Sequence, residues 1–282
     1  MFQADLLKGR TILITGGGTG LGHSMALRFA ELGANIFLVA RREEPLKETC
    51  KQIQGKGVRA AYNCVDIRDF SAVEQAVDVA EKEFGRVDTL VNNAAGNFIA
   101  RTEKLSPNAF NAVVGIVLQG AFFCTLALAK KWIAAKQPGT VLNIVTTYAA
   151  ANSGSGFVVP SACAKAGVLA MTRSLAVEWA RYHIRLNAIA PGPFPTEGAW
   201  SRLLPSKDLE ERVKKHHPMG RFGRHEELAN LAVYLISDHA DYVNGECVVI
   251  DGGLWLRGAG EFNDFLDLPD VAWEMLESAR KK

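Results

Sequence analysis

Short runs of apolar residues alternate with longer segments of helical periodicity along most of the chain. After the first run, Leu21, Met25, Phe29 and Leu32 recur at the spacing of one helix face. The runs show no alternation of apolar and polar positions, which is typical of parallel strands that are buried on both faces. We expect seven strands, at residues 11–15, 35–40, 58–65, 89–93, 140–146, 184–190 and 246–251. Strands that alternate with helices predict an α/β fold with a doubly wound, mostly parallel sheet.

No stretch rich in proline, glycine or serine interrupts this pattern before residue 254. We therefore expect a single domain over residues 1–253 and a C-terminal tail over residues 254–282. In the tail, Pro269 suits the first turn of a short helix. The apolar face of that helix would consist of Val271, Met275 and Ala279. We expect the helix to pack on its own domain or on a neighbouring subunit, in preference to a direct role at an active site.

The net charge and the cysteines exclude several classes of protein. A formal net charge of +2 provides no strong field for nucleic acid. The five cysteines are odd in number and are never spaced as CxxC. We therefore expect reduced thiols in the cytoplasm, with neither a disulfide framework nor a zinc site. The fragments His216–Pro218 and His225–Glu227 contain no HExxH motif, so no metal is expected.

The N-terminus has no apolar signal core. The most apolar stretch, Gly115–Ala129, contains Gln119 and is followed directly by two lysines. It is too short to cross a bilayer, so we expect a buried helix and no membrane span.

Thr15–Gly22 has the sequence TGGGTGLG and stands between the first expected strand and the first expected helix. Glycines at such a junction let the backbone approach a pyrophosphate, and the first N–H groups of the helix can bind it. This context predicts a Rossmann-type dinucleotide site. Arg41 and Arg42 end the second strand, where an acidic residue would bind a ribose 2′-hydroxyl. Two guanidinium groups suit a 2′-phosphate instead, so we expect NADPH as the cofactor.

Four motifs occur in the order typical of short-chain dehydrogenases/reductases, and the chain resembles that family over nearly its whole length. The motifs are TGxxxGxG at Thr15–Gly22, NNAAG at Asn92–Gly96, PGP at Pro191–Pro193 and DGG at Asp251–Gly253. The resemblance implies that Asp66, after the third strand, contacts the adenine. The expected cofactor contacts are Gly16, Gly18, Thr19, Gly20, Leu21, Gly22, Arg41, Arg42, Asp66, Ile67, Asn93, Ala94, Lys165, Pro191, Gly192 and Phe194. The resemblance also implies a homotetramer, in which the helices around Gly115–Ala129 and Ser161–Ala180 pack against their copies.

The usual catalytic pair of that family, a tyrosine four residues before a lysine, is absent. Lys165 is present, but the residue four places before it is Ser161, and none of the five tyrosines precedes a lysine in this way. A serine hydroxyl is a poor replacement, because its pKa is far above the ~10 of tyrosine. Tyr148 stands just past the fifth expected strand, two residues after Thr146, at the sheet edge where ligands bind in such folds. From its position alone, Tyr148 is either a displaced acid or a loop tyrosine without a catalytic role.

The segments NNAAGNF, TTY, GSGFVVPSACAKAG and PGPFPTEGAWSR closely resemble those of the 2,4-dienoyl-CoA reductases of the mitochondrial type. In that subgroup the acid tyrosine follows the fifth strand, a serine replaces it on the helix, and an asparagine follows NNAAG. The resemblance implies that Tyr148 and Asn97 stabilise a dienolate oxygen. It implies further that Ser161 leaves room for the diene and that Lys165 holds the cofactor ribose. Thr146 completes the expected catalytic set, and the loop after Tyr148 is longer than in the subgroup.

The same resemblance implies an acyl-CoA thioester as the substrate. The expected substrate contacts are Arg68, Phe98, Ser106 and Arg202. Hydride addition to the far end of a dienoyl system places negative charge on the thioester oxygen, several bonds away, which accounts for a displaced donor. Val117 stands where the family usually has the helix asparagine of a proton relay, and this argues further against ordinary carbonyl reduction.

Two alternatives stay open. One is a ketone or 3-oxoacyl reductase that uses another donor, and the other is a non-catalytic member that binds NADPH and a partner protein. The retention of Lys165, Tyr148 and Asn97 together favours an enzyme over the second alternative. The expected function is therefore the NADPH-dependent reduction of 2,4-dienoyl-CoA thioesters to enoyl-CoA in the degradation of unsaturated fatty acids.

Overall fold

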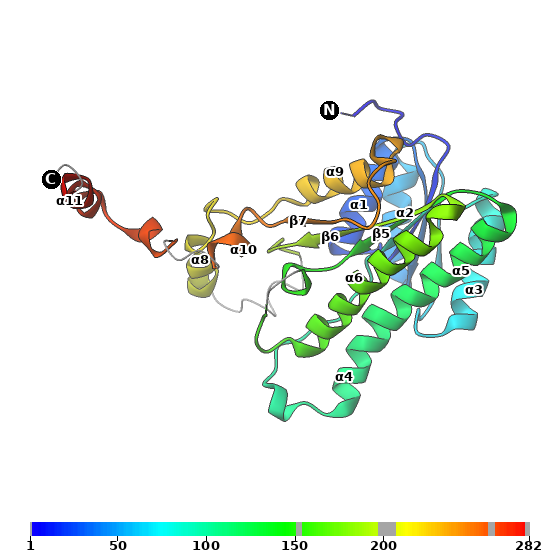
Figure 1. The fold of residues 1–282 in the computed structure, drawn as a ribbon. Coiled ribbons are helices and arrows are strands. Elements are labelled where there is room, and N and C mark those ends of the chain that lie inside the picture. The colour runs from blue at the N-terminus through cyan, green and yellow to red at the C-terminus, as the bar shows by residue number, and fades with distance from the viewer. Residues whose placement is uncertain (1, 151–153, 197–206, 259–262, 280–282) are drawn as a thin grey trace.

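The computed structural model describes residues 2–150, 154–196, 207–258 and 263–279. Seven parallel strands form one sheet in the order β3-β2-β1-β4-β5-β6-β7 (Figure 1). The strands are β1 Thr11–Thr15, β2 Asn35–Ala40, β3 Ala60–Cys64, β4 Thr89–Asn92, β5 Gly139–Ile144, β6 Ile184–Pro191 and β7 Cys247–Ile250. The predicted strands and the doubly wound fold are confirmed. The third strand is shorter than expected, because its pairing with β2 begins only at Ala60, opposite Ile36.

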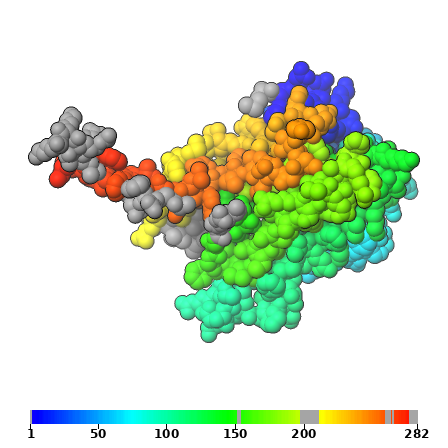
Figure 2. All heavy atoms as spheres, in the orientation of Figure 1, coloured from blue at the N-terminus to red at the C-terminus, as the bar shows by residue number. Residues whose placement is uncertain are grey.

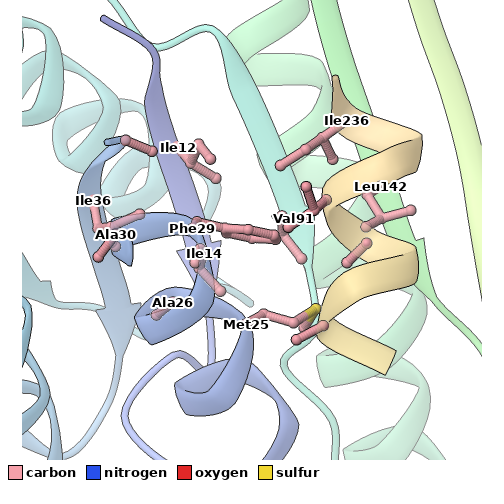
Figure 3. Close-up of a cluster of buried hydrophobic side chains, with 14 of the residues drawn as sticks. Ile12, Ile14, Met25, Ala26, Phe29, Ala30, Ile36, Val91, Leu142 and Ile236 are labelled. Atoms are coloured by element: carbon pink, nitrogen blue, oxygen red, sulfur yellow. The ribbon is translucent and has the colours of Figure 1, made fainter. Parts of the chain in front are cut away.

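Helices cover both faces of the sheet (Figure 1). One face carries α1 Gly20–Glu31, α2 Glu43–Gln54 and α9 His225–Ile236, and the other carries α3 Phe70–Phe84, α5 Gly120–Ala135 and α6 Val159–Trp179. Met25 and Phe29 of α1 are fully buried and pack with Ile14 of β1, Val91 of β4 and Ile236 of α9 (Figure 3). Their four-residue spacing is the helical periodicity seen in the sequence. The strand order reverses between β1 and β4, and parallel sheets bind ligands beyond the carboxyl ends of such strands.

A long helix runs across the second face. The segments α4 Pro107–Val114, η2 Gly115–Gln119, which is a π-helical turn, and α5 form one continuous helix, Pro107–Ala135, of 29 residues. The expectation that this stretch is too short to cross a bilayer was therefore wrong, because the helix begins well before Gly115. Its length and composition would suffice for a span, but 56% of its most apolar window is buried inside the protein. A buried core helix can have the same length and apolar composition, so these two properties alone do not indicate a membrane span.

The tail extends away from the rest of the molecule (Figures 1 and 2). It contains α10 Leu254–Arg257, the 3-10 turn η6 Asn263–Asp267 and α11 Asp270–Ala279. The short helix after Pro269 is thus present, and Val271 and Met275 on it are 62% and 70% exposed. These two side chains are therefore not covered by their own domain, and the packing of α11 on a neighbouring subunit stays a prediction.

The remaining short elements connect the main ones. They are η1 Thr102–Lys104, η3 Thr147–Ala149, η4 Ala180–Tyr182, α8 Lys207–Lys215 and η5 Asp238–Ala240.

Candidate active site

The turn between β1 and α1 can approach a phosphate because three of its four residues, Gly16–Gly18, are glycines. Gly16 and Gly20 have φ angles of 67° and 56°, in the region that favours glycine. A Cβ on Gly16 would lie 3.0 Å from the Cα of Ala94, and one on Gly22 would lie 2.5 Å from the carbonyl oxygen of Gly16. The bare backbone at the amino end of α1 therefore fits the pyrophosphate of a dinucleotide.

Thr15 joins this turn to the segment after β4. Its Oγ1 accepts hydrogen bonds from the main-chain N–H groups of Asn93 and Ala94, both at 3.0 Å. The side chain of Asn93 donates back to the carbonyl oxygen of Thr15, also at 3.0 Å. These bonds lock the ends of β1 and β4 together at the point where the strand order reverses.

A crevice of about 290 Å³ opens at this point. Eight of the expected cofactor residues line it: Gly16, Thr19, Arg41, Arg42, Asp66, Ile67, Asn93 and Ala94. Five other lining residues were not expected from the sequence: Val39, Ala40, Val65, Ala95 and Ile116. The first four lie within two residues of expected ones, so their position could have predicted them. Ile116 could not be predicted, because η2 brings it in from a distant part of the chain.

Tyr148, Ser161 and Asn97 meet at the carboxyl edge of the sheet. The hydroxyl oxygens of Tyr148 and Ser161 lie 3.0 Å apart. The amide Nδ2 of Asn97 donates to the Tyr148 hydroxyl at 3.3 Å. Tyr148 belongs to η3, directly after β5, whereas Ser161 belongs to the first turn of α6 and Asn97 to the segment after β4. The side chain of Tyr148 thus reaches both Ser161 and Asn97, although the loop after Tyr148 is longer than in the resembled subgroup.

Lys165 stands one turn after Ser161 on α6 and is only 7% exposed. Its Nζ donates a hydrogen bond to the carbonyl oxygen of Ile144, at the end of β5. Burial lowers the pKa of Lys165 to about 8. Thr146 lies between β5 and η3, and its carbonyl oxygen accepts the main-chain N–H of Ala149 at 3.0 Å. The end of β5 therefore positions the lysine, Thr146 and Tyr148 together.

Comparison with known proteins agrees with this geometry. Residues 16–255 match the family model described as Enoyl-(Acyl carrier protein) reductase. A solved short-chain dehydrogenase from Bacillus anthracis is 42% identical, with a TM-score of 0.78 over 87% of this chain and 96% of that chain. The chain belongs to the short-chain dehydrogenase/reductase family.

Two relatives are similar over most of their length. A probable 2,4-dienoyl-CoA reductase of Bacillus subtilis (strain 168), named as (2E)-enoyl-CoA-producing, is 49% identical over 249 residues, covering 88% of this chain and 97% of the relative. Probable 2,4-dienoyl-CoA reductase 3 of Caenorhabditis elegans, named as (3E)-enoyl-CoA-producing, is 46% identical over 252 residues, covering 88% of this chain and 81% of the relative.

Within the described part of this short-chain dehydrogenase/reductase, eight expected cofactor residues do not line the crevice. They are Gly18, Gly20, Leu21, Gly22, Lys165, Pro191, Gly192 and Phe194. Gly192 allows close packing, because a Cβ there would lie 2.6 Å from the Cβ of Asp251. The ring of Phe194 is buried in the core beside α9, so a cofactor contact of this residue would come from its main chain.

Asp66 and Arg68, which were expected to contact the adenine and the acyl-CoA, bind each other. The Nε of Arg68 donates to the Asp66 carboxylate at 2.9 Å. Hydrogen bonds from Arg68 are the main cause that lowers the pKa of Asp66. The carboxylate therefore stays ionised as an acceptor, and it holds Arg68 at the rim of the crevice. Their contacts with ligands stay predictions.

Val117 is buried within η2 and cannot carry a proton. A separate buried network lies nearby: Asn92 Nδ2 donates to Thr125 Oγ1 and to Asn143 Oδ1, both at 2.9 Å. Asn143 Nδ2 donates in turn to Thr172 Oγ1 at 2.8 Å. This network ties β4 and β5 to α5 and α6 beneath the active site. The sequence does not indicate this network, because its partners lie on four different elements.

The other expected substrate residues are less tightly grouped. Ser106 caps α4, since its Oγ accepts the main-chain N–H of Ala109 at 3.2 Å. Phe98 adjoins Asn97 and is 36% exposed. Arg202 lies outside the described residues. The substrate contacts of these three residues stay predictions.

A cavity of about 750 Å³, larger than the dinucleotide crevice, lies at the other end of the strands from the catalytic cluster. Its arginines already donate to main-chain carbonyls, such as Arg10 to Ile236 at 2.9 Å and Arg185 to Val243 at 3.0 Å. It lies beyond the amino ends of the strands, so it is not where this family's ligands would bind. Among the described residues, no group of three or more His, Cys, Asp or Glu side chains could hold a metal ion.

Proposed function

We propose that this protein catalyses the NADPH-dependent reduction of 2,4-dienoyl-CoA thioesters to enoyl-CoA in the degradation of unsaturated fatty acids. The observation that carries this proposal is the Tyr148 hydroxyl, which reaches Ser161 from outside α6 and has Asn97 beside it. The names of the relatives from Bacillus subtilis and Caenorhabditis elegans support the same activity.

Tyr148 and Asn97 are the donors to the substrate oxygen. Bound NADPH supplies the hydride, which adds to the far end of the conjugated system, so negative charge develops on the thioester oxygen. Because Asn97 donates to the oxygen of Tyr148, the tyrosine's own proton is available for Ser161 or for a substrate oxygen. A donor aimed at this oxygen stabilises the dienolate. The proton that completes the reduction at carbon comes from water.

Lys165 holds positive charge beneath this site. One of the three protons of its ammonium group goes to the carbonyl oxygen of Ile144, and the others suit the hydroxyls of the nicotinamide ribose. Burial alone lowers the pKa of Lys165 to about 8. Hydrogen-bond acceptors on the bound cofactor and negative charge on the substrate would oppose this effect of burial. They would favour the charged ammonium form of Lys165.

Exposed apolar side chains beside the catalytic cluster suit an acyl chain. Phe98 and Ile99 follow Asn97 and are 36% and 54% exposed, and Phe157 is 59% exposed. The main-chain N–H of Ala100 donates to the carbonyl oxygen of Phe157 at 2.9 Å, so the segments that carry these side chains lie side by side. Several large apolar side chains that are exposed on neighbouring segments are typical of a ligand-binding surface.

The choice of NADPH is supported by Arg41 and Arg42, which both line the crevice. We further propose a homotetramer and a cytoplasmic location. The five cysteines are all free thiols, as suits a reducing compartment.

The experiment that tests the proposal is an NADPH oxidation assay with a 2,4-dienoyl-CoA beside the matched 3-oxoacyl-CoA. We expect oxidation with the dienoyl thioester and little with the 3-oxoacyl thioester. The opposite preference would point to a 3-oxoacyl reductase, and NADPH binding without turnover on either would point to a non-catalytic member. Analysis of the product would locate its double bond, which the names of the two relatives place differently.

A further inference from the structure

His225, the first residue of α9, links two segments at the amino end of α1. Its Nε2 lies 2.6 Å from the carbonyl oxygen of Pro195, and its Nδ1 lies 2.7 Å from the Oγ of Ser24. The Oγ of Ser24 lies in turn 3.1 Å from the carbonyl oxygen of Gly20. These contacts join the segment Pro191–Thr196 to the phosphate-binding turn.

The chemistry of these groups sets the direction of one contact. A carbonyl oxygen only accepts, so Nε2 donates its proton to Pro195. Nδ1 pairs with the hydroxyl of Ser24, so the ring bridges the two segments through both of its nitrogens.

A second imidazole–hydroxyl pair flanks the turn on its other side. The Nδ1 of His23 lies 2.9 Å from Thr49 Oγ1, which lies 3.4 Å from the carbonyl oxygen of Gly18. Burial and then the charge of His225 lower the pKa of His23, whereas Glu48 opposes them.

We propose that His225 is a positioning residue for the dinucleotide: it holds Pro191–Thr196 on α1, beside the phosphate-binding turn. The segment already touches this turn, since a Cβ on Gly20 would lie 3.3 Å from the Cγ2 of Thr196. The inference rests on the proposed use of NADPH. Because the two contacts of His225 keep the segment against the turn, their loss weakens NADPH binding.

The test measures the NADPH dissociation constant of the wild type, His225→Gln and His225→Ala. Glutamine can donate to Pro195 and accept from Ser24, so it can make both contacts of the ring. His225→Gln should therefore bind NADPH nearly as tightly as the wild type. His225→Ala lacks both contacts and should bind NADPH about tenfold more weakly than the wild type.

His239→Gln is the matched control, because His239 is exposed just past the other end of α9, in η5, and its replacement should leave the affinity unchanged. Thermal unfolding without cofactor establishes that each variant folds. If His225→Ala does not fold, Ser24→Ala removes the Nδ1 contact alone and should weaken NADPH binding in its place. An unchanged affinity in a folded His225→Ala would overturn the inference, as would a His225→Gln that folds and yet binds NADPH as weakly as His225→Ala. A wild type that binds no NADPH would refute the proposed function, and this inference with it.

Discussion

The hydroxyl oxygens of Tyr148 and Ser161 lie 3.0 Å apart, although the two residues belong to different elements. Ser161 occupies the position on α6 that a catalytic tyrosine would take, one turn before Lys165. Tyr148 approaches the same place from η3, and Asn97 donates to it from a third segment. A phenol hydroxyl therefore lies beside Ser161, although it comes from outside α6.

Tyr148→Phe should keep the ring and its packing and remove only the hydroxyl. If Tyr148 donates to the forming dienolate, turnover of a 2,4-dienoyl-CoA should fall by ~10²–10³, as for the loss of one oxyanion donor. The NADPH dissociation constant should hardly change, because Tyr148 does not line the dinucleotide crevice. Steady-state kinetics and a fluorescence titration of NADPH measure the two quantities separately.

Tyr242→Phe is the control for that substitution, because Tyr242 is fully exposed to solvent. It should have wild-type kinetics. A fully active Tyr148→Phe together with an inactive Ser161→Ala would show that the serine acts in place. The dienoyl-CoA assignment would then lose its main mechanistic support.

Lys165→Met should stabilise the fold while it abolishes turnover. Burial lowers the pKa of Lys165 from 10.5 in the unfolded chain to about 8. Below pH 8 both states hold the proton, and the folded state bears the full cost of the buried charge, about 3 kcal/mol. Between about pH 8 and pH 10 the folded state releases the proton first, so the free energy of unfolding rises with pH. The advantage of Lys165→Met over the wild type should therefore be largest near pH 7 and narrow as the pH rises.

Chemical denaturation at several pH values measures this difference. Lys47→Met is the control, because Lys47 is exposed and its replacement should change neither the stability nor its pH dependence in this way. A Lys165→Met protein that is less stable than the wild type at pH 7 would contradict the prediction. It would mean that the bond from Lys165 to Ile144 outweighs the cost of burial.

The elements that the sequence predicts correctly are those whose signal is local. Each strand is an apolar run, and the glycines of Thr15–Gly22 stand directly at a strand–helix junction, so neither depends on distant partners. The displaced role of Tyr148 could also be proposed, since it depends on one missing tyrosine and on a position past β5. What the sequence could not show is how far the side chain reaches, because that distance depends on η3 and on the start of α6.

Contacts that depend on the direction of a side chain were the least predictable. The sequence does not indicate that the side chain of Arg68 folds back onto Asp66, two residues before it. The contact of Arg68 with the substrate stays a prediction. The buried pair Asn92 and Asn143 was missed because each lies inside an apolar run, where a sequence pattern indicates only a strand. The direction of the tail was equally unpredictable, since the apolar face of α11 does not say whether it meets its own domain.

The proposed tetramer leads to a prediction about two exposed apolar side chains. Phe122 of α5 and Val177 of α6 are 39% and 82% exposed, on the helices that we expect to pack against their copies. Phe122→Glu and Val177→Glu should each bury a charge in that interface and shift the protein to smaller species. Light scattering should show a tetramer for the wild type and for Val79→Glu, which alters an exposed valine on α3. A wild type that is a stable monomer at micromolar concentration would refute the assembly.

Arg41 should decide which nicotinamide cofactor this protein prefers. Arg41 and Arg42 follow β2 and line the crevice, and within the described ranges neither forms an ion pair with a carboxylate, so both guanidinium groups are available to a 2′-phosphate. Arg41→Ala should weaken NADPH binding by ~1.5–3 kcal/mol, as for one charged hydrogen bond, and should leave NADH binding nearly unchanged. Arg181→Ala is the control, because this exposed arginine lies on η4, outside the crevice. Calorimetric titration with both cofactors separates the outcomes. If Arg41→Ala loses the same amount of binding free energy for NADPH and for NADH, Arg41 supports the crevice in general. Equal affinities of the wild type for NADPH and NADH would show that the two arginines do not select the 2′-phosphate.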